Sequence, residues 1–311
     1  MELNLKDYLS KIEMGERQQF KNIAVVPLFY PDAGKVDYLT LKEALDKKAI
    51  AVNEVSAGGS VPELVVDVNA DVNVLILDGE ELFGAKQNRI LNSSILLWGK
   101  SRTTVPVSCT EQGRWRHVSP TFYDSENVAN YPMRAAKNVS VSHSLRAKEG
   151  FRSDQHGVWA GISELQLKAK VQSSTYAMRD VYESKKGELD EYLKTFEHRP
   201  GQRGMLVFIN GEAVGLDIVS RDAAYRVYHE KLLRSYCIDA VCRSRQDNRE
   251  PGTAKAKEFL EEISKCSESK YKSVGRGDDH RFEGRGFTGS ALEVEGEVLH
   301  LAFLSTAKPQ K

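Results

Sequence analysis

The chain has 311 residues, of which 41% are hydrophobic and 28% charged, a composition typical of a globular protein that buries a sizeable core. Its 44 lysines and arginines equal its 44 aspartates and glutamates, so the formal net charge is zero. This balance argues against a general nucleic-acid binder, which needs excess positive charge to neutralise phosphates, and leaves only a local basic patch open.

The cysteines and the N-terminal stretch bear on metal binding and location. Cys109, Cys237, Cys242 and Cys266 form no C-x-x-C pair, and no histidine cluster accompanies them. We therefore expect no structural metal, and this sparse cysteine usage favours a reducing compartment. The charged N-terminus lacks the apolar core of a signal peptide, and no window approaches the roughly 18 apolar residues of a membrane helix. We expect a soluble, cytoplasmic protein without membrane contact.

Residues 1–118 are predicted to form a β-rich half. Helical spacing of apolar residues predicts a short helix over 5–12 and another after Thr40, a plausible N-cap. Short apolar runs at hairpin spacing predict strands, and such runs usually form a sandwich or barrel. The predicted strands cover 22–30, 51–56, 62–69, 72–78, 89–99 and 103–111.

The polar stretch that follows is predicted to be a long connection or an exposed arm, because it is rich in Ser and Asn and contains two prolines. We therefore divide the chain into the β-rich half, a polar connection over 119–150 and a mixed α/β half over 151–311. One continuous domain is the alternative.

The mixed half begins with helical periodicity over 154–197, which Gly187 is expected to divide. Asn210-Gly211 predicts a type I′ hairpin turn, because both central residues of that turn need positive φ. A helix over 220–242 is predicted to begin at Ser220 as its N-cap.

The last part of the chain is predicted to contain a helix over 254–266 and then strands. The stretch 275–286 lacks the strand before and the helix after that a dinucleotide-binding loop requires. Because it is rich in glycine and charged residues, we predict that it is a solvated loop. Glu295-Gly296 predicts a second hairpin turn. Because strictly alternating β-α units are absent, these elements together indicate an α+β fold.

The stretch "GEELFGAKQNR" is the first candidate site segment. Lys86, Gln87, Asn88 and Arg89 stand at a strand entry, where Arg offers a bidentate fork and Asn and Gln recognise amides or hydroxyls. We expect these four residues to bind a ligand, with Glu80 as a candidate catalytic carboxylate. A solvated hairpin connection with surface ion pairs is the alternative.

The stretch "SCTEQGRW" is predicted to be the other half of the same site. Arg114 beside Trp115 suits an anionic ligand that also stacks, as a nucleotide would, and Glu111 is a second carboxylate able to activate water. Here the alternative is a small buried cysteine with an aromatic lid over the core.

A polar stripe on a predicted helix is the third feature. Lys231, Ser235 and Asp239 are spaced by four and share one helix face. We expect this stripe to face solvent. Covering a cleft between the two halves is the alternative.

Across most of residues 23–304 the chain resembles the ARG-and-Rhodanese-Phosphatase-superfamily-associated protein domain family. The resemblance is carried most specifically by "GEELFGAKQNR" and "SCTEQGRW", and also by "FINGEAVGLDI", "KLLRSYCIDAV" and "GSALEVEGEVLHLAF". It implies a prokaryotic conflict (defence) system and NAD or ADP-ribose metabolism, because the family's name reflects gene association with ADP-ribosylglycohydrolases and phosphatases. It supplies no catalytic residues and names no cofactor.

Two functions therefore stay open. The first is binding or processing of a nucleotide of the ADP-ribose type, with Glu80 and Glu111 as carboxylates and the basic groups on phosphate. The second is a non-catalytic interaction or scaffold protein, for which the neutral net charge would permit homo-oligomers.

Overall fold

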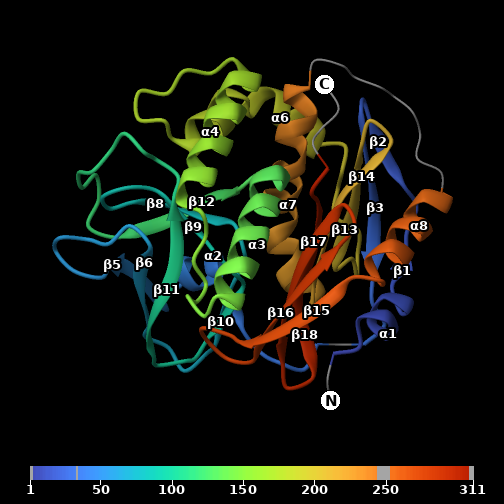
Figure 1. The fold of residues 1–311 in the computed structure, drawn as a ribbon, viewed down its shortest axis with the longest axis horizontal. Coiled ribbons are helices and arrows are strands. Elements are labelled where there is room, and N and C mark those ends of the chain that lie inside the picture. Colours follow the sequence, from blue (N-terminus) through green and yellow to red (C-terminus); the bar gives the residue numbers. More distant parts are fainter. Residues whose placement is uncertain (1–2, 33, 244–252, 308–311) are drawn as a thin grey trace.

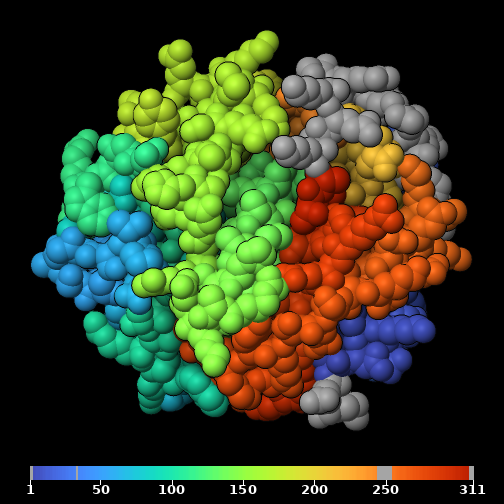
Figure 2. Space-filling view, in the orientation of Figure 1, coloured from blue at the N-terminus to red at the C-terminus, as the bar shows by residue number. Residues whose placement is uncertain are grey.

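The computed structural model describes residues 3–32, 34–243 and 253–307 and shows the predicted α+β fold. A large antiparallel sheet lies on one side, a smaller β-rich body lies on the other, and a layer of helices lies between them (Figure 1). Figure 2 shows this central layer, in green, between the blue-to-teal β-rich body and the red C-terminal strands.

The large sheet contains strands from both ends of the chain. Its strands are β1 (Glu13–Met14), β2 (Gln18–Phe20), β3 (Ile23–Phe29), β13 (Gly204–Ile209), β14 (Glu212–Val219), β15 (Ser267–Lys272), β16 (Asp278–Gly284), β17 (Phe287–Val294) and β18 (Glu297–Ser305). They follow the order β1-β3-β13-β14-β18-β17-β16-β15, and β2 also pairs with β3. Helices α1 (Leu5–Ser10) and α8 (Thr253–Ile263) cover its outer face over one apolar core.

The β-rich body encloses a second core. Its strands are β4 (Leu39–Thr40), β5 (Ile50–Glu54), β6 (Glu63–Val68), β7 (Val74–Ile76), β8 (Glu80–Gly84), β9 (Arg89–Leu91), β10 (Ile95–Leu97), β11 (Arg102–Cys109) and β12 (Phe122–Val128). One sheet has the order β12-β8-β9-β11-β6-β5 and a small one has the order β10-β7-β4. Helix α2 (Leu41–Asp46) packs against this core and begins with the predicted Thr40 cap, completed by Glu43 as a capping box.

The central helical layer forms the third core, against the inner face of the large sheet. Its helices are α3 (Tyr131–Arg146), α4 (Gln155–Ala169), α5 (Met178–Ser184), α6 (Lys186–Leu193) and α7 (Asp222–Cys242). Helix α7 contacts β12 on one side and β13 and β14 on the other, so it joins the two sheets.

The prediction of an irregular polar connection over residues 119–150 is wrong. This stretch contains strand β12 and the buried helix α3. The polarity of α3 is misleading because its buried face carries Arg134, Lys137, Asn138 and Ser142 beside apolar side chains. Each of the first three hydrogen-bonds to a buried partner, so the helix lacks the apolar periodicity that would have indicated it.

Three smaller predictions also need correction. The helical stretch breaks over 170–177, and Gly187 lies inside α6. Helix α7 begins after Arg221, because the Ser220 hydroxyl pairs with Tyr38. The stretch 275–286 is mostly strand β16 rather than a loop. The two predicted hairpin turns are confirmed, since Asn210, Gly211, Glu295 and Gly296 all have positive φ.

A buried ionic network connects the large sheet to the helical layer. The two Nη atoms of Arg134 lie 2.6 and 3.0 Å from the carboxylate of Asp217 on β14. Tyr236 of α7 donates to the same carboxylate over 2.5 Å, and His300 of β18 lies 3.2 Å from it. Burial alone would raise the pKa of Asp217, but the Arg134 charge and the His300 hydrogen bond outweigh it and hold that pKa well below its usual range.

The same network continues into the β-rich body. Lys137 of α3 pairs with Asp78, which precedes β8, and donates to the carbonyl of Asn92 over 3.1 Å. The Ser94 hydroxyl accepts from the Asp78 amide and lies 2.7 Å from Nδ1 of His300. The β-rich body and the large sheet are therefore tied together by buried polar contacts through α3.

Within the described ranges, no helix has both the length and the apolar composition needed to cross a membrane.

Candidate functional site

The structure brings the two predicted site segments together. The side-chain oxygen of Asn88 accepts a hydrogen bond from Arg114 over 3.1 Å. The backbone N–H of Asn88 donates to the Glu111 carboxylate over 3.3 Å. Gln87 donates to the Glu111 carbonyl over 3.0 Å. Seven of the eight predicted residues therefore form one group, which we call the Arg89 cluster: Lys86, Gln87, Asn88, Arg89, Glu111, Arg114 and Trp115.

Most polar groups of the Arg89 cluster are already paired with one another. Arg114 and Glu111 form a buried ion pair of 2.5 Å, and Thr175 donates to the other Glu111 oxygen over 2.9 Å. Trp115 lies at the surface, 48% exposed, with Lys86 and Arg89 within cation–π distance of its ring. None of these side chains lines the cavity described below.

Glu80, the eighth predicted residue, lies apart from the cluster. It is fully buried, and its carboxylate accepts from Lys231 of α7 over 2.6 Å and from the Leu77 amide over 2.6 Å. Lys231 also pairs with Asp124 over 2.9 Å. Burial opposes the charge of Lys231, but the two carboxylates outweigh this effect and raise its pKa.

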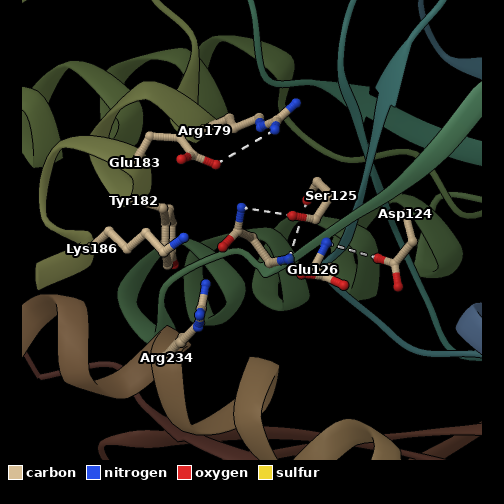
Figure 3. A pocket seen from close by; sticks show the side chains of 9 residues that line it. Asp124, Ser125, Glu126, Arg179, Tyr182, Glu183, Lys186 and Arg234 are labelled. Atoms are coloured by element: carbon tan, nitrogen blue, oxygen red, sulfur yellow. Dashed lines mark hydrogen bonds and ion pairs between the residues drawn. The ribbon is translucent and has the colours of Figure 1, made fainter. Parts of the chain in front are cut away.

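A polar cavity of about 210 Å³ lies where β12 meets helices α5, α6 and α7 (Figure 3). We call it the cationic pocket, because three basic side chains reach it from three different helices. Its lining residues are Asp124, Ser125, Glu126, Asn127, Arg179, Tyr182, Glu183, Lys186 and Arg234. Strand β12 is irregular here: its register with β8 shifts between Asp124 and Val128, and Glu126 has a positive φ of 60°.

The three cations of the pocket are incompletely neutralised. Arg179 lies 3.5 Å from Glu183, and Arg234 reaches Asp190 only at 3.9 Å. The ammonium of Lys186 has no hydrogen bond or ion pair to any residue that the structure describes. In contrast, Asp124 is held by Lys231, and Glu126 by Lys42. The wall therefore combines three cations with three carboxylates, and Lys186 is the cation that these pairs leave without a partner among the described residues.

Two buried polar atoms in the pocket wall have no partner among the described residues. They are Nε of Arg179, a donor, and Oδ1 of Asn127, an acceptor. Asn127 is only 2% exposed, and its amide nitrogen donates to the Ser125 carbonyl over 3.1 Å. Buried polar groups are normally paired, so these two atoms are unsatisfied within the described structure.

Behind Ser125 lies a buried carboxylate that the sequence analysis did not select. Burial raises the pKa of Glu81 to about 7, although the hydroxyls of Thr110 and Ser125 and the charge of Arg179 lower it. Thr110 donates to Glu81 Oε1 over 2.8 Å, and Oε2 has no partner in the described part of the chain. A carboxyl with a pKa near neutrality can accept and donate a proton, so it is a candidate general acid or base.

The pocket was missed because its residues come from segments far apart in the chain. The one available signal was the polar stripe on α7, predicted to face solvent. That prediction is wrong: Lys231, Ser235 and Asp239 are buried. Lys231 pairs with Asp124 at the pocket edge. The alternative, that this helix face covers a cleft between the two halves, is therefore the better interpretation.

The family described as ARG and Rhodanese-Phosphatase-superfamily-associated Protein domain matches residues 11–304. No curated protein and no solved structure matches the chain.

Proposed function

The chain belongs to the ARG and Rhodanese-Phosphatase-superfamily-associated protein domain family, and we propose that it binds a small phosphate-bearing ligand in the cationic pocket. The observation that carries this proposal is the meeting of three cations from three helices, Arg179, Lys186 and Arg234, of which Lys186 has no partner among the described residues. Arginine and lysine are the side chains that proteins use most often to hold phosphate.

The size of the pocket limits what it encloses. Pockets that hold drug-sized molecules usually measure roughly 300–1,000 Å³, and the cationic pocket measures about 210 Å³. It therefore has room for a phosphate and an attached sugar, and a small shift of the Asn127 side chain would let its unpaired oxygen accept from a sugar hydroxyl. A nucleotide or ADP-ribose would place its phosphoribosyl end inside and its base outside.

Replacing Lys186 with Ala is expected to weaken binding of ribose 5-phosphate about ten-fold or more, because a hydrogen bond to a charged group contributes roughly 1.5–3 kcal/mol. Isothermal titration calorimetry on the wild type and the variant measures this loss directly. Because Lys186 is exposed and unpaired in the described structure, the variant should unfold at the same temperature as the wild type without ligand.

Lys194→Ala is the matched control for that experiment. Lys194 is an exposed lysine at the other end of α6 and does not line the pocket. Its removal changes the net charge equally and should leave the affinity within about two-fold, as expected for a screened distant charge. Equal losses in both variants would show a general charge effect and contradict a site at the pocket.

The enzymatic part of the proposal concerns Glu81 and Ser125. A hydroxyl of the ligand, or a water in the pocket, would give its proton to the Ser125 hydroxyl, which would pass its own proton to Glu81. Glu81 suits this role because burial raises its pKa to about 7. The alternative function, a non-catalytic scaffold in a multi-gene defence system, is supported by the neutral net charge. Ligand binding without turnover, together with self-association in sedimentation, would favour the scaffold.

A further inference from the structure

We propose that the Arg89 cluster contains a second oxyanion-binding site, closed in this conformation by Trp115. The site would hold a phosphate group against one edge of the Arg89 guanidinium. It is separate from the cationic pocket, because Arg89 pairs in register with Leu82 and Cys109, while Glu81 pairs with Ile90. Side chains of successive strand residues point to opposite faces, so Arg89 and Glu81 lie on opposite faces of that sheet.

Arg89 presents an unoccupied fork. Its side chain is fully buried, and Nη1 donates to the side-chain oxygen of Gln87 and the carbonyl of Asn88, over 3.0 and 3.2 Å. Nε and Nη2 have no partner anywhere in the described structure. These two atoms share one edge of the planar guanidinium, and that edge binds two oxygens of a carboxylate or phosphate side by side.

The charges around Arg89 do not balance. The cluster contains the cations Arg89, Arg114 and Lys86, and the carboxylates that act on Arg89 among the described residues are Glu54 and Glu111. Glu111 is committed to Arg114. The thiol of Cys109 adds no charge, because burial raises its pKa. A buried cation without a paired anion is costly, so the fold tolerates Arg89 at a cost that a bound oxyanion would offset.

Trp115 is the aromatic side chain that lies against the Arg89 guanidinium. The centre of its ring lies 5.8 Å from the Arg89 guanidinium carbon, and the π face partly substitutes for a missing anion. Lys86 lies 5.2 Å from the same ring and donates to the carbonyls of Ala57 and Gly58 in the loop after β5. Gly59, at a φ of 77°, lets this loop approach Trp115 closely. A turn of the half-exposed indole would open the fork to solvent and bring Lys86 toward the same ligand.

The test follows the three tryptophan indole N–H signals by ¹H–¹⁵N NMR during a titration with inorganic phosphate. We expect the Trp115 signal to shift saturably in the wild type and in Lys186→Ala, whose cationic pocket is impaired. We expect no saturable shift in Arg89→Gln, which removes the fork. The Trp115 signal is assigned by its disappearance in Trp115→Phe.

Three outcomes would overturn the second site. One is a Trp115 signal that phosphate leaves unchanged in the wild type. Another is a shift that persists in Arg89→Gln. The third is a shift that is lost in Lys186→Ala, because the anion would then be bound in the cationic pocket alone. Thermal unfolding without phosphate adds an independent check. Because Arg89 has no ion pair among the described residues, we expect Arg89→Gln to unfold at or above the wild-type temperature. Arg114→Gln, which breaks an ion pair, should unfold below it.

Discussion

Asp217→Asn is expected to lower the free energy of unfolding by about 3–5 kcal/mol, the usual cost of breaking a buried ion pair by removing one partner. Asp217 is fully buried and receives hydrogen bonds from Arg134 and Tyr236. Among the described residues, an amide would leave Asp78, 3.8 Å away, as the carboxylate that pairs with the Arg134 charge. Equilibrium unfolding in urea, monitored by circular dichroism, measures the loss.

The exposed ion pair of Glu164 and Lys168 provides the control. Its atoms lie 2.7 Å apart on the surface of α4, so Glu164→Gln should cost less than about 0.5 kcal/mol. Because the Asp217 network reaches both halves of the chain, we also propose that the wild type unfolds in one cooperative transition, as one continuous domain. Two separate transitions, with Asp217→Asn shifting only one, would contradict this proposal and favour separate domains.

Glu81→Gln is expected to stabilise the protein at high pH and to have little effect at low pH. Burial raises the pKa of Glu81 to about 7, above the value of 4.5 for an unperturbed glutamate. The folded state therefore holds the proton more tightly than the unfolded state, and this stability is lost as pH rises from the unfolded pKa through the folded one. Between about pH 5 and about pH 8 the loss amounts to roughly 2–3 kcal/mol, at about 1.4 kcal/mol per pKa unit.

Urea unfolding at several pH values, compared between wild type and variant, isolates this contribution. The comparison with the variant is needed because burial also raises the pKa of Asp239 to about 7. In the wild type, both groups therefore lower the stability over the same pH range. Glutamine keeps an oxygen that can accept from Thr110. A variant that is less stable by the same amount at every pH would show that Glu81 does not titrate in this range.

Local chemistry made part of the fold predictable. The positive φ required at Asn210-Gly211 and Glu295-Gly296 is satisfied in the predicted hairpins, and Thr40 caps its helix as expected. These features depend on a few neighbouring residues, so one sequence is enough to identify them. Helix α3 was missed because its buried polar side chains find partners that are distant in the chain, such as Asp217 and Thr288.

The two candidate sites differ in the same way, in whether residues close together in the sequence or the tertiary fold defines them. The two segments of the Arg89 cluster could be paired from sequence, because each carries a dense set of polar groups at a strand end. What they do there depends on which polar atoms stay unpaired, and this is a property of packing. The cationic pocket could not be assembled from sequence, since Ser125, Arg179, Lys186 and Arg234 belong to four separate elements that only the tertiary fold brings together.

A crystal structure of the protein with ribose 5-phosphate tests the central claim most directly. We predict the phosphate beside Arg179, Lys186 and Arg234, with a sugar hydroxyl donating to the Asn127 side-chain oxygen. A cationic pocket that stays empty at saturating ligand, or a ligand bound at another place with the pocket unoccupied, would contradict the proposed function.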